Sequence, residues 1–88
     1  FANFKVLNLS SFDTSKVKEM QQMFSYFFPT QLDISSFTFN NVEEFSEMFD
    51  HFSTSCEILV KDEAAKTWIN TNFPTLTNVK IKTADVSA

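Results

Sequence analysis

Residues 7–31, LNLSSFDTSKVKEMQQMFSYFFPTQ, align without a gap on residues 32–56, LDISSFTFNNVEEFSEMFDHFSTSC, and this pair of segments decides the fold. Nine of the 25 aligned positions are identical, and they include a Ser-Ser-Phe triplet and a Met-Phe pair. A period of 25 lies within the roughly 20–29 residues of leucine-rich repeats, in which each unit supplies one strand and one helical segment. The sequence therefore predicts a repeat solenoid.

Each unit opens with an alternation of apolar and polar residues. The first unit begins Leu7-Asn8-Leu9-Ser10 and the second begins Leu32-Asp33-Ile34-Ser35. Alternation with a period of two is typical of a strand whose apolar side faces a core and whose polar side faces solvent. We expect one short strand at the start of each unit.

A second apolar pattern follows the Ser-Ser-Phe triplet. Apolar residues recur there at spacings of three and four, at Val17, Met20, Phe24 and Phe27 and again at Val42, Phe45, Phe49 and Phe52. This spacing predicts one-sided helices. Strand-helix units joined by right-handed crossovers give an α/β repeat solenoid, with parallel strands on one face and helices on the other. Phe12 with Phe37, and Phe24 with Phe49, would then form two columns of stacked rings.

The register ends after Cys56. Ile58 and Val60 alternate as a strand, Asp62 can cap a helix carrying Ala65, Trp68 and Ile69, and Val79 and Ile81 alternate again. This β-α-β pattern is typical of the terminal unit of a solenoid. We expect residues 1–6 to be the remnant of a preceding repeat, 7–31 and 32–56 to be repeats, and 57–88 to be a C-terminal cap that frays from Ala84 onward. The chain is expected to be a fragment of a longer protein.

Composition excludes several classes of partner. The chain is 43% hydrophobic with twelve Phe, which suffices for a core, and it has no Gly, which excludes glycine-rich phosphate loops. Its net charge is −4 and it has no Arg, so nucleic acid and anionic membrane surfaces are poor partners. No apolar run approaches the roughly 18 residues of a transmembrane helix, so we expect no membrane insertion of this segment.

Few residues could carry chemistry. His51 and Cys56 are the sole His and Cys, so a zinc site would lack two ligands and a nucleophilic dyad would lack an orienting group. The carboxylates Glu43, Glu44, Glu47 and Asp50 fit a solvated helix face better than a calcium site. We therefore expect no catalytic residue, no metal and no cofactor, and the protein is not expected to be an enzyme.

The polar side of the predicted strands is the candidate partner-binding surface. Its residues are Asn8, Ser10, Asp33, Ser35, Lys61, Lys80 and Lys82. Solenoids bind extended partners on such surfaces, and the three lysines would attract an acidic partner. The plainer interpretation is that these residues are the solvent side of a half-buried sheet.

The repeated segments SSFDTSKVKEMQQMF and SSFTFNNVEEFSEMF resemble the BspA-like leucine-rich repeats, also met as the DUF285 repeats of mycoplasma surface proteins. The unit of that family looks like LDLSSFDTSNVTDMSSMF. Residues 7–56 carry the resemblance, and the tail VKDEAAKTWINTNFPTLTNVKIK looks like the family's closing segment. This chain departs from the pattern at Tyr26 and His51, where small residues are usual, and at Phe39, where Thr or Ser is usual.

The resemblance implies a secreted or anchored bacterial protein at the cell surface. Family members are associated with adhesion, so the expected partner is a protein of a host or of a neighbouring cell, and the family has no catalytic residues to transfer. The alternative function is a structural stalk or capping segment with no ligand of its own. An apolar N-terminal edge around Phe1, Phe4, Val6 and Phe12 would favour self-association.

Overall fold

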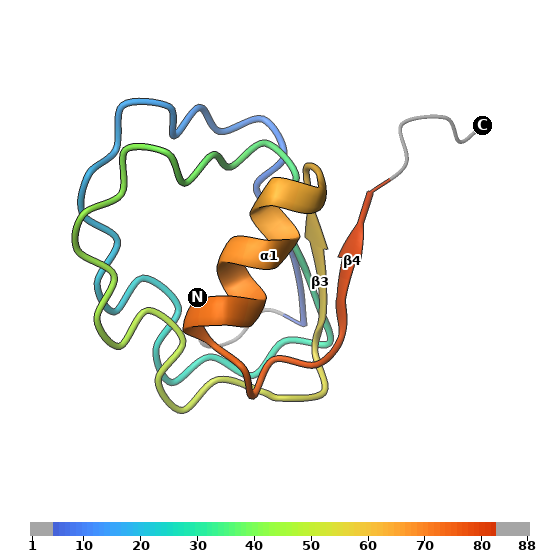
Figure 1. Ribbon diagram of the computed structural model, residues 1–88. Helices are drawn as coiled ribbons and strands as arrows, with labels where there is room; N and C mark the ends of the chain where they lie inside the picture. Colours follow the sequence, from blue (N-terminus) through green and yellow to red (C-terminus); the bar gives the residue numbers. More distant parts are fainter. Residues whose placement is uncertain (1–4, 83–88) are drawn as a thin grey trace.

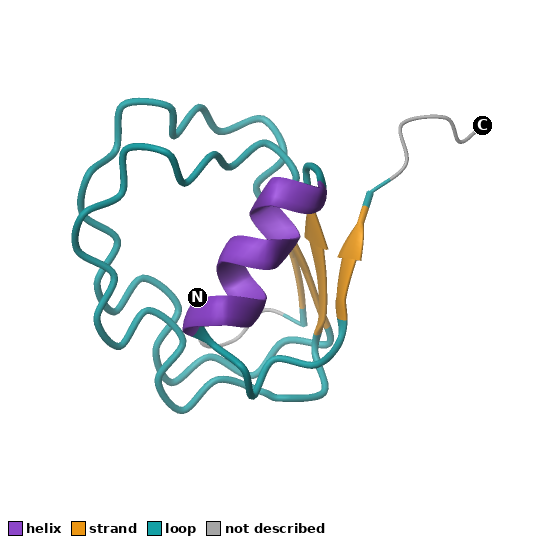
Figure 2. Cartoon of the chain, in the orientation of Figure 1, coloured by secondary structure: helices purple, strands orange, loops and turns teal. Residues whose placement is uncertain are grey.

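The computed structural model describes residues 5–82, which form one four-stranded parallel sheet and one helix (Figures 1 and 2). The elements in chain order are β1 (Val6–Asn8), β2 (Gln31–Asp33), β3 (Glu57–Val60), α1 (Glu63–Asn72) and β4 (Val79–Ile81). The strand order in the sheet is β1-β2-β3-β4, so every connection moves one strand along. The rest of the described chain is loops and turns, and the molecule is a small α/β domain.

The strand register follows the sequence alignment. In the first pair Leu7 lies opposite Leu32, an offset of 25 residues, and in the second pair Leu32 lies opposite Ile58. The parallel sheet of short strands is therefore confirmed, although β1 and β2 each begin one residue before the predicted alternation. The side chains of Leu32, Ile58 and Val79 lie in one row across the sheet and are buried.

The predicted C-terminal β-α-β unit is also confirmed, and local sequence explains the bounds of its helix. The carboxylate of Asp62 accepts a hydrogen bond from the N–H of Ala65 at 3.0 Å, which satisfies one unpaired donor of the first turn. The helix ends at Asn72, where the N–H of Phe73 donates to the carbonyl of Ile69. Among residues 5–82, no helix combines the length and apolar character required to span a membrane.

The prediction of helices after the two Ser-Ser-Phe triplets is wrong. Residues 9–30 and 34–56 instead form two loops that run beside each other on the same side of the sheet as α1 (Figure 1). Alternate N–H groups of the first loop donate across to the second, from Met20 to Glu44, Gln22 to Ser46, Phe24 to Met48 and Tyr26 to Asp50, at 2.7–3.2 Å. These donors are the ones that an α-helix would have used internally.

The bends of the two loops occur at equivalent positions. Four residues have positive φ, namely Gln22 at 59°, Tyr26 at 55°, Glu47 at 60° and His51 at 56°, and the last two follow the first two by 25 residues. With no Gly in the chain, L-residues adopt this left-handed conformation at a cost of roughly 1–2 kcal/mol each. A loop that bends every few residues buries Met20, Phe24 and Phe27 as a helix would, which is why the apolar spacing misleads.

Aromatic rings fill the space between the loops and α1. The predicted contact of Phe24 with Phe49 is confirmed, with ring centroids 5.4 Å apart. The predicted stack of Phe12 on Phe37 is wrong, because Phe37 packs on Phe24 of the preceding loop and is 1% exposed, whereas Phe12 is 54% exposed. The equivalent neighbour for Phe12 would precede β1, and residues 5–82 supply none.

Candidate functional site: the open face of the sheet

One face of the sheet is left uncovered by the described chain. The two loops and α1 lie against the other face (Figure 1). We call the uncovered surface the open face and define it by the outward residues of the strands and of the positions that follow them, which are Asn8, Gln31, Asp33, Glu57, Leu59, Lys61, Lys80 and Lys82. Parallel sheets are normally covered on both faces, so this surface is unusual for its sheet type.

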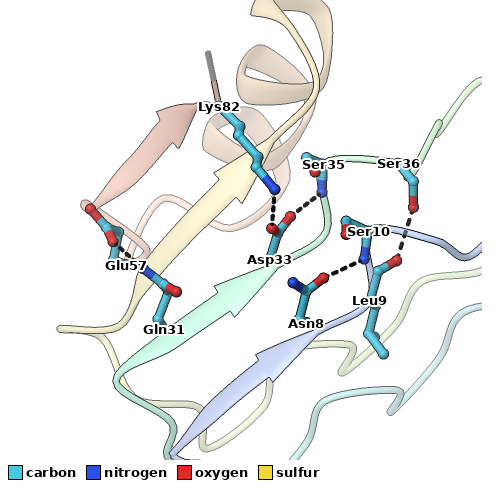
Figure 3. Close-up of polar contacts among 9 residues, drawn as sticks. All are labelled: Asn8, Leu9, Ser10, Gln31, Asp33, Ser35, Ser36, Glu57 and Lys82. Atoms are coloured by element: carbon cyan, nitrogen blue, oxygen red, sulfur yellow. Dashed lines mark hydrogen bonds and ion pairs between the residues drawn. The ribbon is translucent and has the colours of Figure 1, made fainter. Parts of the chain in front are cut away.

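Two of the predicted site residues end their strands. The side-chain oxygen of Asn8 accepts a hydrogen bond from the N–H of Ser10 at 2.9 Å, and that of Asp33 accepts from the N–H of Ser35 at 3.0 Å (Figure 3). Asn and Asp form such turns readily because their side chains reach the backbone two residues ahead. The two turns are equivalent in the sequence alignment, so these four residues have a structural role in each unit.

Asp33 is buried, although the sequence places it on the solvent side. The residue is 4% exposed, and Lys82 reaches across β3 to place its Nζ atom 2.6 Å from the second carboxylate oxygen (Figure 3). Burial alone would raise the pKa of Asp33, but hydrogen bonds from Lys82 and Ser35 outweigh it and lower the pKa below its ordinary value. The carboxylate is charged and fully partnered near neutral pH.

A second polar row crosses three strands. The amide of Gln31 donates to Glu57 at 2.8 Å, and Nζ of Lys80 lies 3.2 Å from the other oxygen of the same carboxylate. The hydrogen bond from Gln31, followed by that from Lys80, lowers the pKa of Glu57. Sequence reasoning missed Gln31 and Glu57, although each lies two residues before an outward strand position and therefore shares its face.

The pairing changes the charge of the predicted basic end. Lys80 and Lys82 neutralise Glu57 and Asp33, whereas Lys61 is exposed and makes no ion pair within residues 5–82. The open face therefore offers one free ammonium group rather than three among the residues that the structure describes. Its remaining surface is polar and nearly neutral, with the half-buried Leu59 at its centre.

The other residues considered for chemistry lie elsewhere. Cys56 is 2% exposed, and burial, followed by the charge of Glu57, raises the pKa of its thiol to about 11. His51 is exposed, stacks on Tyr26 with ring centroids 4.4 Å apart, and lies 3.0 Å from Asp50. Within the described part of the chain, no three His, Cys, Asp or Glu side chains gather closely enough to hold a metal ion.

The carboxylates expected on a helix face lie on the second loop instead. Glu47 accepts a hydrogen bond from the amide of Gln22 at 2.8 Å, which joins equivalent positions of the two loops. Glu44 pairs through its backbone with Glu19, again 25 residues away. These acids therefore border the contact between the loops.

Comparison with known proteins gives one family. The family described as "Mycoplasma protein of unknown function, DUF285" matches residues 1–84. Searches of curated proteins and of solved structures found no match. Because the match spans nearly the whole chain, the protein belongs to the DUF285 family of mycoplasma proteins of unknown function.

Proposed function

We propose that this chain is a non-enzymatic module of a bacterial cell-surface protein and that it binds a protein partner on the open face. The observation that carries the proposal is a parallel sheet with one uncovered face. A flat, extended surface on a rigid sheet suits an elongated protein segment. The similarity of residues 7–56 to repeats of secreted adhesion proteins supports the same function and an extracellular location.

The contacts on this face also indicate the character of the partner. Asp33 and Glu57 already have cationic partners, so a bound protein would gain little from new ion pairs with them. Leu59 and Lys61 remain as the apolar and charged groups that a partner can contact. We therefore expect a nearly neutral protein surface with an apolar centre rather than a strongly acidic one.

Binding can be tested with matched charge variants. Immobilised residues 1–88 would be titrated with soluble extracellular-matrix proteins by surface plasmon resonance. Lys61→Glu on the open face should weaken binding at least tenfold, whereas Lys16→Glu, an equal charge change on the first loop, should leave it unchanged. The absence of any saturable binder, or equal losses in both variants, would contradict the proposal.

A structural role without a ligand is the second candidate. The internal pairing of most charged groups on the open face favours it, because those groups are stabilised without a partner. Deleting residues 1–56 from the parent protein would distinguish the two functions. Retained adhesion by the parent would support a stalk or capping role.

We further propose that the fold is a piece of a BspA-like leucine-rich-repeat solenoid, with residues 7–31 and 32–56 as coils and residues 57–88 as the C-terminal cap. The common offset of 25 residues in strand pairing, bends and inter-loop contacts supports this proposal. Three large apolar residues in and just before the first loop are exposed, namely Val6 at 57%, Phe12 at 54% and Phe28 at 65%. Phe1 and Phe4, expected on the same edge, lie outside the described residues.

This exposed apolar edge should promote self-association. Light scattering after size exclusion would compare the chain with a Phe12→Ser variant. We expect the parent chain to form dimers or larger species at high concentration and the variant to be mainly monomeric. A parent chain that stays monomeric at every concentration would count against an open solenoid edge.

A further inference from the structure

A separate cavity lies where α1 begins, beside the carboxyl end of β3 (Figure 1). Its volume is about 140 Å³ and it opens to solvent. The walls come from the segment after β2, residues 37–40, and from the start of α1. Ligands of open parallel α/β sheets bind outside the carboxyl ends of the strands, so this position favours a binding site.

The walls combine aromatic surface with hydrogen-bonding groups. Trp68 and Phe39 both line the cavity, and their rings stack with centroids 4.3 Å apart. The indole N–H of Trp68 is a donor with no hydrogen-bond acceptor within residues 5–82, although such groups normally have one when buried. Asn40 is exposed and its side-chain amide likewise makes no hydrogen bond to a described residue. The cavity therefore offers unused donors and acceptors beside a flat apolar wall.

Charge excludes simple ions as the natural occupant. Lys61 lines the cavity and would repel a cation. Asp62 also lines it, and together with Glu63 it opposes an anion, while one oxygen of Asp62 already caps the N–H of Ala65. A purely apolar ligand would leave Asn40 and the indole N–H without partners, which is unfavourable. The ligand that remains is neutral, with hydroxyl groups at its edge and an apolar face.

We propose that this cavity binds one pyranose ring of a neutral carbohydrate. A cavity of about 150 Å³ accommodates a benzene ring, so the available volume suits a single six-membered ring. The apolar C–H face of the sugar would lie against the aromatic wall, and its hydroxyl groups would pair with Asn40, Asp62 and the indole N–H. This site is independent of protein binding on the open face, so either proposal can fail alone.

Nuclear magnetic resonance can test the site with defined probes. The ¹⁵N-labelled chain would be titrated with the methyl glycosides of galactose, glucose, mannose and N-acetylglucosamine. We expect saturable shifts at Asn40, Asp62 and Ala64 for at least one glycoside, with a Kd of about 1 mM for so small a ligand. Amides of β1, which is separated from β3 by β2, should not shift.

Two pairs of variants make the test specific. Ala64→Leu would fill the cavity from an exposed helix position, and we expect at least a tenfold loss of affinity, whereas Thr71→Leu, further along the same helix, should bind normally. Asn40→Ala should lower affinity several-fold and Asn70→Ala should not. The proposal is overturned if no glycoside gives saturable shifts, if Ala64→Leu binds as the parent does, or if acetate alone reproduces the shifts.

Discussion

Replacement of Lys82 by Met should destabilise the domain more than its surface position suggests. The side chain of Lys82 is 41% exposed, but its partner Asp33 has a side chain only 5% exposed. Lys82→Met keeps the aliphatic stem and removes the ammonium group, which leaves a buried carboxylate with the N–H of Ser35 as its described hydrogen-bond donor. Losing a charged hydrogen-bond partner of a buried group costs roughly 1.5–3 kcal/mol, so we expect about 2 kcal/mol.

The matched variant is Asp33→Asn, because the first unit already contains that arrangement. Asn8 holds the equivalent turn with a neutral side chain, so the amide introduced by Asp33→Asn can retain the hydrogen bond from Ser35 while Lys82 returns to solvent. We expect a loss of about 1 kcal/mol. In the double variant no carboxylate remains to be stranded, so its loss should be close to that of Asp33→Asn and well below the sum.

Urea and thermal unfolding followed by Trp68 fluorescence would measure these differences. About 2 kcal/mol corresponds to a fall in Tm of about 8–16 °C for a domain of this size. Because the pKa of Asp33 is lowered in the folded state, its contribution is present above the unfolded pKa of about 3.9 and is lost as pH falls through the folded value. Asp33→Asn should therefore flatten the loss of stability below about pH 4. An additive double variant, or equal effects of the two single variants, would refute this reasoning.

Three further outcomes are expected. Phe37→Ala should cost about 3–5 kcal/mol in an unfolding titration and Phe12→Ala less than about 1 kcal/mol, because the first ring is buried and the second is half exposed; equal losses would contradict the burial difference. Glu47→Gly should be neutral or stabilising because φ is positive there, whereas Glu44→Gly should cost about 0.5–1 kcal/mol. The Cys56 thiol should react with Ellman's reagent near neutral pH only as the protein unfolds, and fast labelling of the native chain would oppose a pKa near 11.

The strands and the C-terminal helix could be predicted because their signals are local. Alternation at Leu7 and Leu32, the capping position of Asp62, and the 25-residue period all act within a few residues or between similar segments. The loops could not be predicted from apolar spacing, because a helix and a loop that bends every few residues bury the same positions. Left-handed residues at Gln22 and Glu47 gave no signal, since Gly is the usual marker of that conformation.

The candidate site was predicted in outline and missed in its contacts. The alternation places Asn8 and Lys80 on one face, and the register agrees. Nothing local indicates that Lys82 meets Asp33, because 49 residues separate them and the contact depends on how β3 and β4 follow β2. The burial of Asp33 follows from that long-range contact, so a pattern read along the chain assigned it to solvent.

The inter-loop hydrogen bonds described for residues 20–26 have a spectroscopic consequence. One 10-residue helix and four strands of three or four residues are the only regular elements within residues 5–82. Far-ultraviolet circular dichroism should therefore resemble that of a poorly ordered chain. Amide hydrogen exchange should show the opposite, with slow exchange at Met20, Gln22, Phe24 and Tyr26, because each N–H is bonded to the second loop. A weak dichroism signal from this protein is thus the expected property of its folded state and no sign of failure to fold.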